Sequence, residues 1–359
     1  MIGWASLYLL AALNGGPFLD VLNSEATDSG PGLAGVVIVD GNVAFAGARG
    51  LADIESGRAL SVDTPMYAGS LSKVFTAVVV MKLVETGDLA LDEPADFGQP
   101  ADLDAPFDVR SLLSHASGLP REGNFGYWFS GEFPNAIRLH DYVTPLLAEV
   151  RPGGDARYSN VGYAVLGLAA EEATGRPFET LLSDLVTRPL GMTGTGAPGP
   201  AQDIARGYSP PNRLIPSEER PFGGVGRKIG DRHLREYHDA KAMTPAFGIY
   251  TSARDLGKLV RLLIGDEDPG VLAPVTRTRM RQAQASGWGL GLGISSVDDN
   301  PVATHSGWFA AHRSFLLLDA GNNVGVAVLA NSDDAVPARV ARALYRVALS
   351  LRESSASDR

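Results

Sequence analysis

The sequence predicts an α+β fold in which both ends of the chain build one antiparallel sheet and the middle forms a mostly helical second lobe. Apolar, β-branched runs typical of strands occur near the start, over 33–40, and near the end, between 286 and 331. The residues between these runs carry mainly helical patterns. A chain that begins and ends in antiparallel strands can close a single sheet with both of its ends, and helices then flank that sheet.

We expect one domain with two lobes because 359 residues exceed an average domain. The domain is expected over 17–352, between an apolar N-terminal segment, 1–16, and a polar tail, 353–359. Within the domain, 17–95 and 245–352 form the α/β lobe, and 96–244 form the helical lobe with a surface excursion. The excursion, residues 194–244, is rich in Gly, Pro and charge, so it either runs over the surface or is partly mobile.

The composition excludes several classes of function. A net charge of −10 disfavours nucleic acid and anionic membranes as partners. The absence of Cys removes a thiolate nucleophile and a Cys-ligated zinc site. His233 and His238 are five residues apart, which does not match a zinc-binding helix motif. We therefore expect no metal and no cofactor, and a small molecule as the partner; the oligomeric state stays open.

The N-terminal run WASLYLLAAL, residues 4–13, has two interpretations. It is apolar enough for the core of a signal peptide, but no Lys or Arg precedes it and no clean small-x-small cleavage site follows it. We favour an amphipathic helix that packs on the domain, which makes a cytoplasmic location slightly preferable to a secreted or periplasmic one. No stretch is long enough to span a membrane as a helix.

The first predicted elements are a helix over 17–29 and a β-hairpin. The hairpin consists of two extended runs, 33–40 and 43–53, around a short link at Gly41-Asn42. Residues in the link are typical of tight turns between antiparallel strands.

A central buried helix follows over 71–85. Almost every face of this segment is apolar, and Gly87 is placed to end it. Ser70 then lies at the helix N-terminus, where backbone N–H groups and the helix dipole favour negative charge.

The remaining elements follow from periodicity and turn residues. Over 109–120 we expect a short helix that runs into a turn. We expect further helices over 138–150, 158–173, 177–189, 251–266 and 335–351, and strands over 286–295, 302–319 and 323–331. The loop over 122–133 is rich in Gly and aromatic residues, and we expect Tyr127 and Trp128 in it to form a lid or a wall of a binding site.

The stretch Ser70-Leu71-Ser72-Lys73 carries the first chemical motif. Residues three apart share a helix face, so the Lys73 amine can reach the Ser70 hydroxyl and activate it as a nucleophile. A lone Ser-x-x-Lys arises by chance about 0.4 times in a chain of this composition. Two further short motifs give it context: Tyr158-Ser159-Asn160 at a helix entrance, and His305-Ser306-Gly307 on a late strand.

The order of these motifs, together with the segments SLLSHASGLP and RPLGM, resembles the serine β-lactamases and penicillin-recognising enzymes. The chain looks closest to the branch with class C β-lactamases, D-alanyl-D-alanine carboxypeptidases, D-aminopeptidases and β-lactamase-like esterases. The resemblance runs from about residue 32 to residue 347. No Gly-x-Ser-x-Gly motif supports an α/β-hydrolase instead.

The resemblance implies a role for each motif residue. Ser70 would form an acyl-enzyme, with Lys73 as its base. Tyr158 would pass a proton to the leaving group and later activate water. Asn160 would hold Lys73 and the substrate, and the backbone N–H groups of Ser70 and Trp308 would form the oxyanion hole.

The third motif and the residues after it differ from the family pattern, and these differences bear on which substrate the site would accept. His305 stands where class C β-lactamases carry a Lys, and a mostly neutral His at pH 7 weakens the case for strong β-lactamase activity. Trp308 and Phe309 would narrow the cleft or give it an apolar wall, and Arg313 would either restore a positive charge or face outward. His115 could pair with Ser70, but we favour a His that bonds a neighbouring loop.

These features predict a serine hydrolase that cleaves a small ester or amide. The alternatives are a D-stereospecific peptidase, carboxypeptidase or weak β-lactamase acting on D-amino-acid peptides or β-lactams, and a transacylase. A non-catalytic binding protein on the same fold is an alternative of another class.

Overall fold

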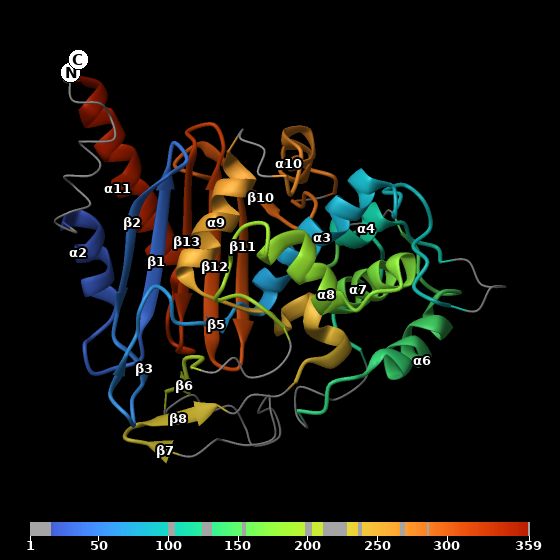
Figure 1. Ribbon diagram of the computed structural model, residues 1–359, viewed down its shortest axis with the longest axis horizontal. Coiled ribbons are helices and arrows are strands. Elements are labelled where there is room, and N and C mark those ends of the chain that lie inside the picture. Colours follow the sequence, from blue (N-terminus) through green and yellow to red (C-terminus); the bar gives the residue numbers. More distant parts are fainter. Residues whose placement is uncertain are drawn as a thin grey trace.

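A computed structural model describes residues 16–99, 105–123, 131–152, 156–197, 203–210, 228–235, 239–265, 270–285 and 287–357. A six-stranded antiparallel sheet stands beside a group of helices, as expected (Figure 1). Its strands, in spatial order, are β10 (Gly293–Val297), β11 (Asn300–Phe309), β12 (His312–Asp319), β13 (Val324–Ala330), β1 (Leu33–Val39) and β2 (Asn42–Arg49). Val36 of β1 lies opposite Ala327 of β13. Both ends of the chain therefore meet at the centre of one sheet.

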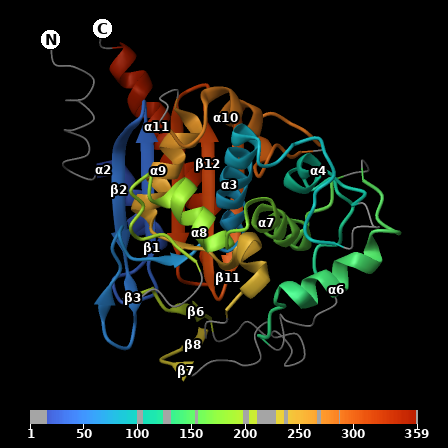
Figure 2. The same cartoon turned by 45° about the vertical axis from the view of Figure 1, so that its right-hand side comes forward.

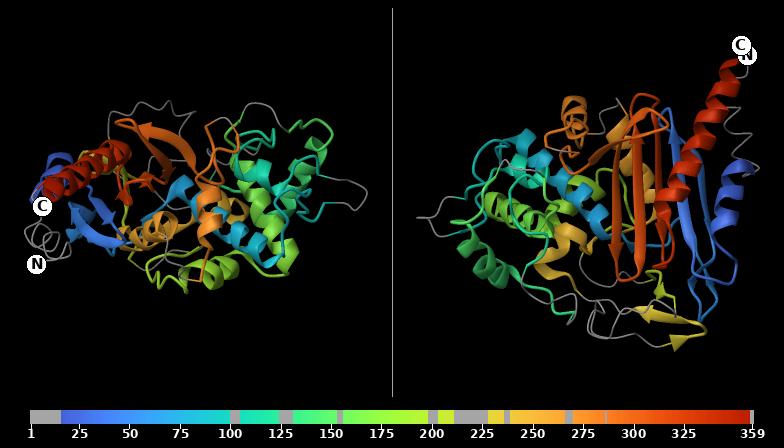
Figure 3. Two further views of the ribbon diagram at one scale, coloured as in Figure 1. Left: turned by 90° about the horizontal axis from the view of Figure 1, so that it is seen from above. Right: turned by 180° about the vertical axis from the view of Figure 1, so that it is seen from behind.

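Helices cover both faces of this sheet, which explains why β1 and β13 are buried along their whole length. Helix α9 (Ala253–Ile264) lies on one face, whereas α2 (Gly16–Glu25) and α11 (Pro337–Ser357) pack on the other (Figure 3). Helix α11 continues past the expected end at residue 351. Gly325 lets α9 approach β13 closely, because a Cβ there would collide with Val260.

The second lobe is mostly helical and lies on the other side of α3 (Ser72–Thr86) from the sheet (Figure 2). Its helices are α4 (Val109–Leu113), α6 (Ala136–Leu146), α7 (Asn160–Thr174) and α8 (Phe178–Leu182), and α10 (Pro274–Met280) follows α9. Helix α3 is buried and ends at Gly87, whose φ of 83° is left-handed, as the sequence predicts. Within the described residues, no helix combines the length and apolar character needed to cross a membrane.

Two expected strands differ from the structure. Residues 302–319 form a hairpin rather than one strand, because Ala310 and Ala311 turn the chain with φ values of 49° and 59°. Such turns normally carry Asn or Gly, so two alanines give no sequence signal. The expected strand over 286–295 begins only at Gly293, since Gly287 and Gly291 adopt left-handed turn conformations.

Short strand pairs complete the fold. The pairs are β3 (Leu51–Asp53) with β4 (Arg58–Ala59) and β5 (Met66–Tyr67) with β9 (Tyr250–Thr251), and the excursion contributes β6 (Gly207–Ser209), β8 (Arg232–Arg235) and β7 (Lys228–Ile229). The described start of the excursion lies against the main sheet, because the buried Tyr208 donates its N–H to the Asn331 carbonyl at 2.9 Å.

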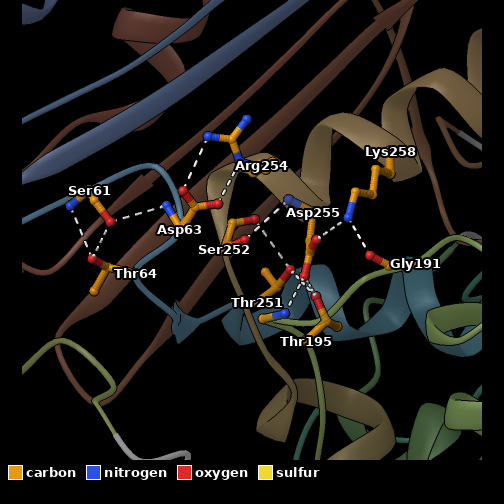
Figure 4. Close-up of polar contacts among 11 residues, drawn as sticks. Ser61, Asp63, Thr64, Gly191, Thr195, Thr251, Ser252, Arg254, Asp255 and Lys258 are labelled. Atoms are coloured by element: carbon orange, nitrogen blue, oxygen red, sulfur yellow. Dashed lines mark hydrogen bonds and ion pairs between the residues drawn. The ribbon is translucent and has the colours of Figure 1, made fainter.

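A buried carboxylate anchors the first turn of α9 (Figure 4). Ser252 caps the helix by accepting from the Asp255 N–H at 3.2 Å. The Asp255 carboxylate accepts from the Gly194 N–H, the Thr195 hydroxyl and the Lys258 amine at 2.7, 3.0 and 2.9 Å. These bonds compensate the burial of the charge. The same bonds hold Gly194 and Thr195 next to β9. Strand β9 in turn pairs with β5, which ends just before Ser70.

Candidate active site

Ser70 lies in a single 3-10 turn, Gly69–Leu71, that leads into α3. This turn is pressed against β11 at two glycines. A Cβ at Gly69 would collide with the Trp308 backbone, and a Cβ at Gly307 would collide with the Ala68 carbonyl. The close contact brings the Ser70 motif and the His-Ser-Gly motif together, although 235 residues of sequence separate Ser70 from His305.

Lys73 is completely buried on the first turn of α3, and its amine has three polar neighbours. Nζ lies 2.6 Å from Asn160 Oδ1, 2.7 Å from the Ala246 carbonyl and 3.4 Å from Ser70 Oγ. A neutral amine has two hydrogens and one lone pair. The first two neighbours can only accept, so they take both hydrogens and leave the lone pair directed at the Ser70 hydroxyl.

The surroundings also favour the neutral amine. Burial lowers the pKa of Lys73 well below its usual 10.5; the nearby Glu122 carboxylate raises this pKa and the Arg121 guanidinium lowers it. An uncharged Lys73 is the form that can take a proton from Ser70.

Tyr158 comes from the segment that enters α7 and shares the site with Lys73. Its ring centroid lies 4.7 Å from Lys73 Nζ and 5.2 Å from the Arg121 guanidinium carbon. Burial raises the pKa of the Tyr158 hydroxyl, and a hydrogen bond with Ser70 offsets part of that rise. The phenol is therefore protonated at neutral pH and can deliver a proton.

Asn160 is the first residue of α7, where Ser159 caps the helix by accepting from the Gly162 N–H at 2.8 Å. The cap fixes the helix entrance and points the Asn160 side chain at Lys73. Asn160 Nδ2 donates to Glu122 Oε1 at 2.5 Å, so the amide bridges the amine and a carboxylate.

His305 lies on β11 with 4% of its surface exposed. Its Nδ1 is 2.8 Å from the Ser306 carbonyl, which can only accept, so the proton sits on Nδ1. Burial, with a smaller contribution from Lys73, lowers the pKa of His305 to about 3. The third motif therefore presents a neutral ring at neutral pH.

A cavity of about 860 Å³ joins these residues. Ser70, Tyr158 and His305 line it together with Phe315, Val336 and Pro337, of which Pro337 is the first residue of α11. The lining thus combines the nucleophile with apolar side chains, so the cavity can hold a substrate with an apolar group.

The substrate-contact residues expected from the sequence divide into three groups. Trp308 and Arg313 lie opposite each other on β11 and β12 and both line the cavity. Phe309 does not: it is fully buried and packs on Tyr67 and Phe247, because alternate residues of a strand face opposite sides. Tyr127 and Trp128 lie outside the described residues.

Several lining residues were not singled out from the sequence, among them Arg121, Glu122, Phe247 and Trp288. Arg121 and Glu122 directly follow the segment SLLSHASGLP, which is part of the family resemblance. Their position next to that segment is the signal by which they could have been found. Phe247 lies in the short π-helix Thr244–Gly248 and Trp288 in a turn before β10, and nothing in the sequence marks either side chain as part of a site. His115 is not paired with Ser70; its Nδ1 accepts from the Ser159 N–H at 3.1 Å, and its ring packs on Tyr158 at 4.5 Å.

The chain is similar to several known proteins. Esterase EstB of Burkholderia gladioli is 28% identical over 345 residues, covering 84% of this chain and 86% of that protein. The D-alanyl-D-alanine-carboxypeptidase/endopeptidase AmpH of Escherichia coli K12 is 29% identical over 226 residues, 58% of each chain. Among solved structures, D-amino acid amidase from Ochrobactrum anthropi SV3 superposes with a TM-score of 0.77 at 21% identity, covering 94% of this chain and 99% of the other. That likeness shows a shared fold.

The match to a family model spans nearly the whole chain. The model described as Beta-lactamase covers residues 23–350, which include Ser70, Lys73, Tyr158 and His305. The relatives named above are an esterase and a carboxypeptidase/endopeptidase, and the matching family model is described as Beta-lactamase. This chain belongs to the β-lactamase family.

Proposed function

We propose that the protein is a serine hydrolase that cleaves small esters or amides through an acyl-enzyme on Ser70. The observation that carries the proposal is the environment of Lys73, whose two acceptor neighbours leave the amine lone pair directed at Ser70 Oγ. A base so placed contributes about 10²- to 10⁴-fold to the rate.

The reaction proceeds in two halves. Ser70 Oγ attacks the substrate carbonyl while its proton passes to Lys73, and the backbone N–H groups of Ser70 and Trp308 receive the oxyanion. The intermediate collapses as Tyr158 gives its proton to the leaving group and regains one from Lys73. Water then attacks the acyl-enzyme with the same groups acting in reverse, which releases the acid and restores Ser70.

The cavity offers apolar side chains to an acyl group. His305 is neutral at neutral pH, so the third motif itself offers no cation for a substrate carboxylate, whereas Arg121 and Arg313 also line the cavity. The cavity lining includes Phe315, Val336 and Pro337, which suit an apolar arm. The 28% identity to an esterase over most of the chain supports esters as the first substrates to test.

A second candidate is hydrolysis of D-amino-acid amides or peptides. It is supported by a D-aminopeptidase of Brucella anthropi that is 31% identical over 172 residues, 45% of this chain and 32% of that protein. A panel of D- and L-amino-acid p-nitroanilides distinguishes this activity from plain esterase activity.

The proposal is tested with a p-nitrophenyl ester and a fluorophosphonate probe. The wild type should hydrolyse the ester and be labelled once, on Ser70, whereas Ser70→Ala should do neither. Ser296→Ala, on an exposed position of β10, is the matched control and should behave as wild type. Equal hydrolysis by wild type and Ser70→Ala, or labelling elsewhere, would rule the proposal out.

A further inference from the structure

Glu122 enters the site from outside the three motifs. It lies in the segment after α4, lines the cavity, and has 26% of its side chain exposed. Its Oε1 accepts from Asn160 Nδ2 at 2.5 Å, while the other end of the same amide, Oδ1, lies 2.6 Å from Lys73 Nζ. Asn160 thus stands between Glu122 and the base.

The chemistry of a carboxylate fixes which way this amide points. A carboxylate has no hydrogen to donate, so the NH₂ group of Asn160 must face Glu122 and its oxygen must face Lys73. The reversed amide would set the Asn160 oxygen against the Glu122 oxygens, with no hydrogen between them, and that arrangement is repulsive.

The orientation matters for the direction of the Lys73 lone pair. With the oxygen of Asn160 and the Ala246 carbonyl as acceptors, both amine hydrogens are occupied and the lone pair faces Ser70. A reversed Asn160 would donate an N–H to that lone pair and compete with the Ser70 hydroxyl. We propose that Glu122 is a positioning residue that fixes the amide of Asn160 and so keeps the Lys73 lone pair available to Ser70.

Glu122 has a second effect through its charge. Its carboxylate raises the pKa of Lys73, and the neighbouring Arg121 lowers it. The two residues are adjacent in sequence and opposite in sign, so Arg121 is a control whose effect on Lys73 runs in the other direction.

The first experiment measures Lys73 directly and does not depend on any activity. The chain has only five Lys, so ¹³C-lysine labelling gives five resolvable side-chain signals, and the signal absent from Lys73→Met identifies Lys73. Glu122→Gln should lower the pKa of Lys73 by about one unit. Glu122→Asp keeps the charge and should leave it near the wild-type value, and Arg121→Gln should raise it. An unchanged Lys73 titration in Glu122→Gln would overturn the inference.

The second experiment tests the amide orientation and rests on the proposed function. The readout is the maximal rate of Ser70 labelling by a fluorophosphonate, measured above the Lys73 pKa so that charge no longer matters. Glu122→Gln can donate as well as accept, so Asn160 is free to reverse, and the rate should fall about ten- to a hundredfold. Glu122→Asp should recover part of the rate because it can only accept.

A double-mutant cycle identifies the route of the effect. In an Asn160→Ala background, Glu122→Gln should cause no further loss, because no amide remains to be oriented. An equal loss in both backgrounds, or a full rate in Glu122→Gln alone, would refute the positioning role. If wild-type Ser70 is not labelled at all, the proposed function fails, while the Lys73 titration still decides whether Glu122 acts on the amine.

Discussion

Replacing Lys73 with Met tests the central chemical claim, that a neutral buried amine takes the Ser70 proton. Met has nearly the same length and no basic group, so it removes the proton acceptor while filling the space. Because general bases contribute about 10²- to 10⁴-fold, ester hydrolysis should fall by that factor. At about 1.4 kcal/mol per tenfold, the lost transition-state stabilisation is about 3–5 kcal/mol.

The substitution also affects stability, in two opposing ways. Asn160 Oδ1 and the Ala246 carbonyl lose their donor, which costs about 1–3 kcal/mol for each group left unpaired. Against this, the protein no longer holds a polar amine in a dry site, which cost free energy in the wild type. Because the two effects oppose each other, we expect only a small change in melting temperature. The loss of activity should therefore not result from unfolding.

A second lysine on the same helix is the matched control. Lys82 is partly exposed on α3, where it pairs with Glu85 at 3.5 Å. Lys82→Met should keep wild-type rates of p-nitrophenyl butyrate hydrolysis and of fluorophosphonate labelling. If folded Lys73→Met retains activity within tenfold of wild type, Lys73 is not the base and the reasoning from its three neighbours is wrong.

Three further predictions follow from the same geometry. Phe309→Ala should destabilise the protein by about 3–5 kcal/mol in urea unfolding while changing ester specificity little, because its ring is packed in the core and does not line the cavity. As pH increases, kcat/KM should rise in a single step set by the deprotonation of Lys73, whose pKa lies below 10.5. His305→Gln should leave that step in place, because His305 is already neutral above about pH 3. Asp333→Ala should raise KM by about tenfold, since it removes the 2.5 Å bond from Trp308 Nε1 that holds the indole in the cavity wall. It also removes the acceptor of the buried Ser209 hydroxyl, so KM is compared with that of Ser209→Ala, which keeps the indole bond; unchanged KM would show that the indole needs no such support.

Much of the fold could be predicted because the signals were local and strong. The all-apolar helix, its glycine stop and the first hairpin depend on residues close in sequence, and the structure confirms them. The Ala310-Ala311 turn could not be predicted, since tertiary pairing of β11 with β12 forces alanines into a left-handed conformation. Local propensity has no information on such a turn.

The motif residues of the candidate site could be predicted from the sequence, but the groups that support them could not. Ser70, Lys73, Tyr158 and His305 are recognisable from order and spacing; the structure places Ser70, Tyr158 and His305 around one cavity and the buried Lys73 amine 3.4 Å from Ser70 Oγ. Phe309 was misplaced because the strand register that turns it inward depends on pairing with β12. The Ala246 carbonyl, a backbone atom in a π-helical turn, leaves no trace in a side-chain pattern.

The supporting groups explain why the motif residues work only in the assembled fold. Lys73 belongs to α3, Asn160 to the helical lobe and His305 to the sheet, and each lobe supplies what the other lacks. The sheet places the Trp308 backbone against Gly69, next to Ser70, whereas the helical lobe provides Asn160, one of the two acceptors that orient the amine. Relative displacement of the lobes by about 1 Å would separate Lys73 from its 2.6–2.7 Å contacts and release the lone pair from Ser70. Because the packing of α3 against both lobes sets these distances, substitutions at that interface should reduce activity before they unfold the protein.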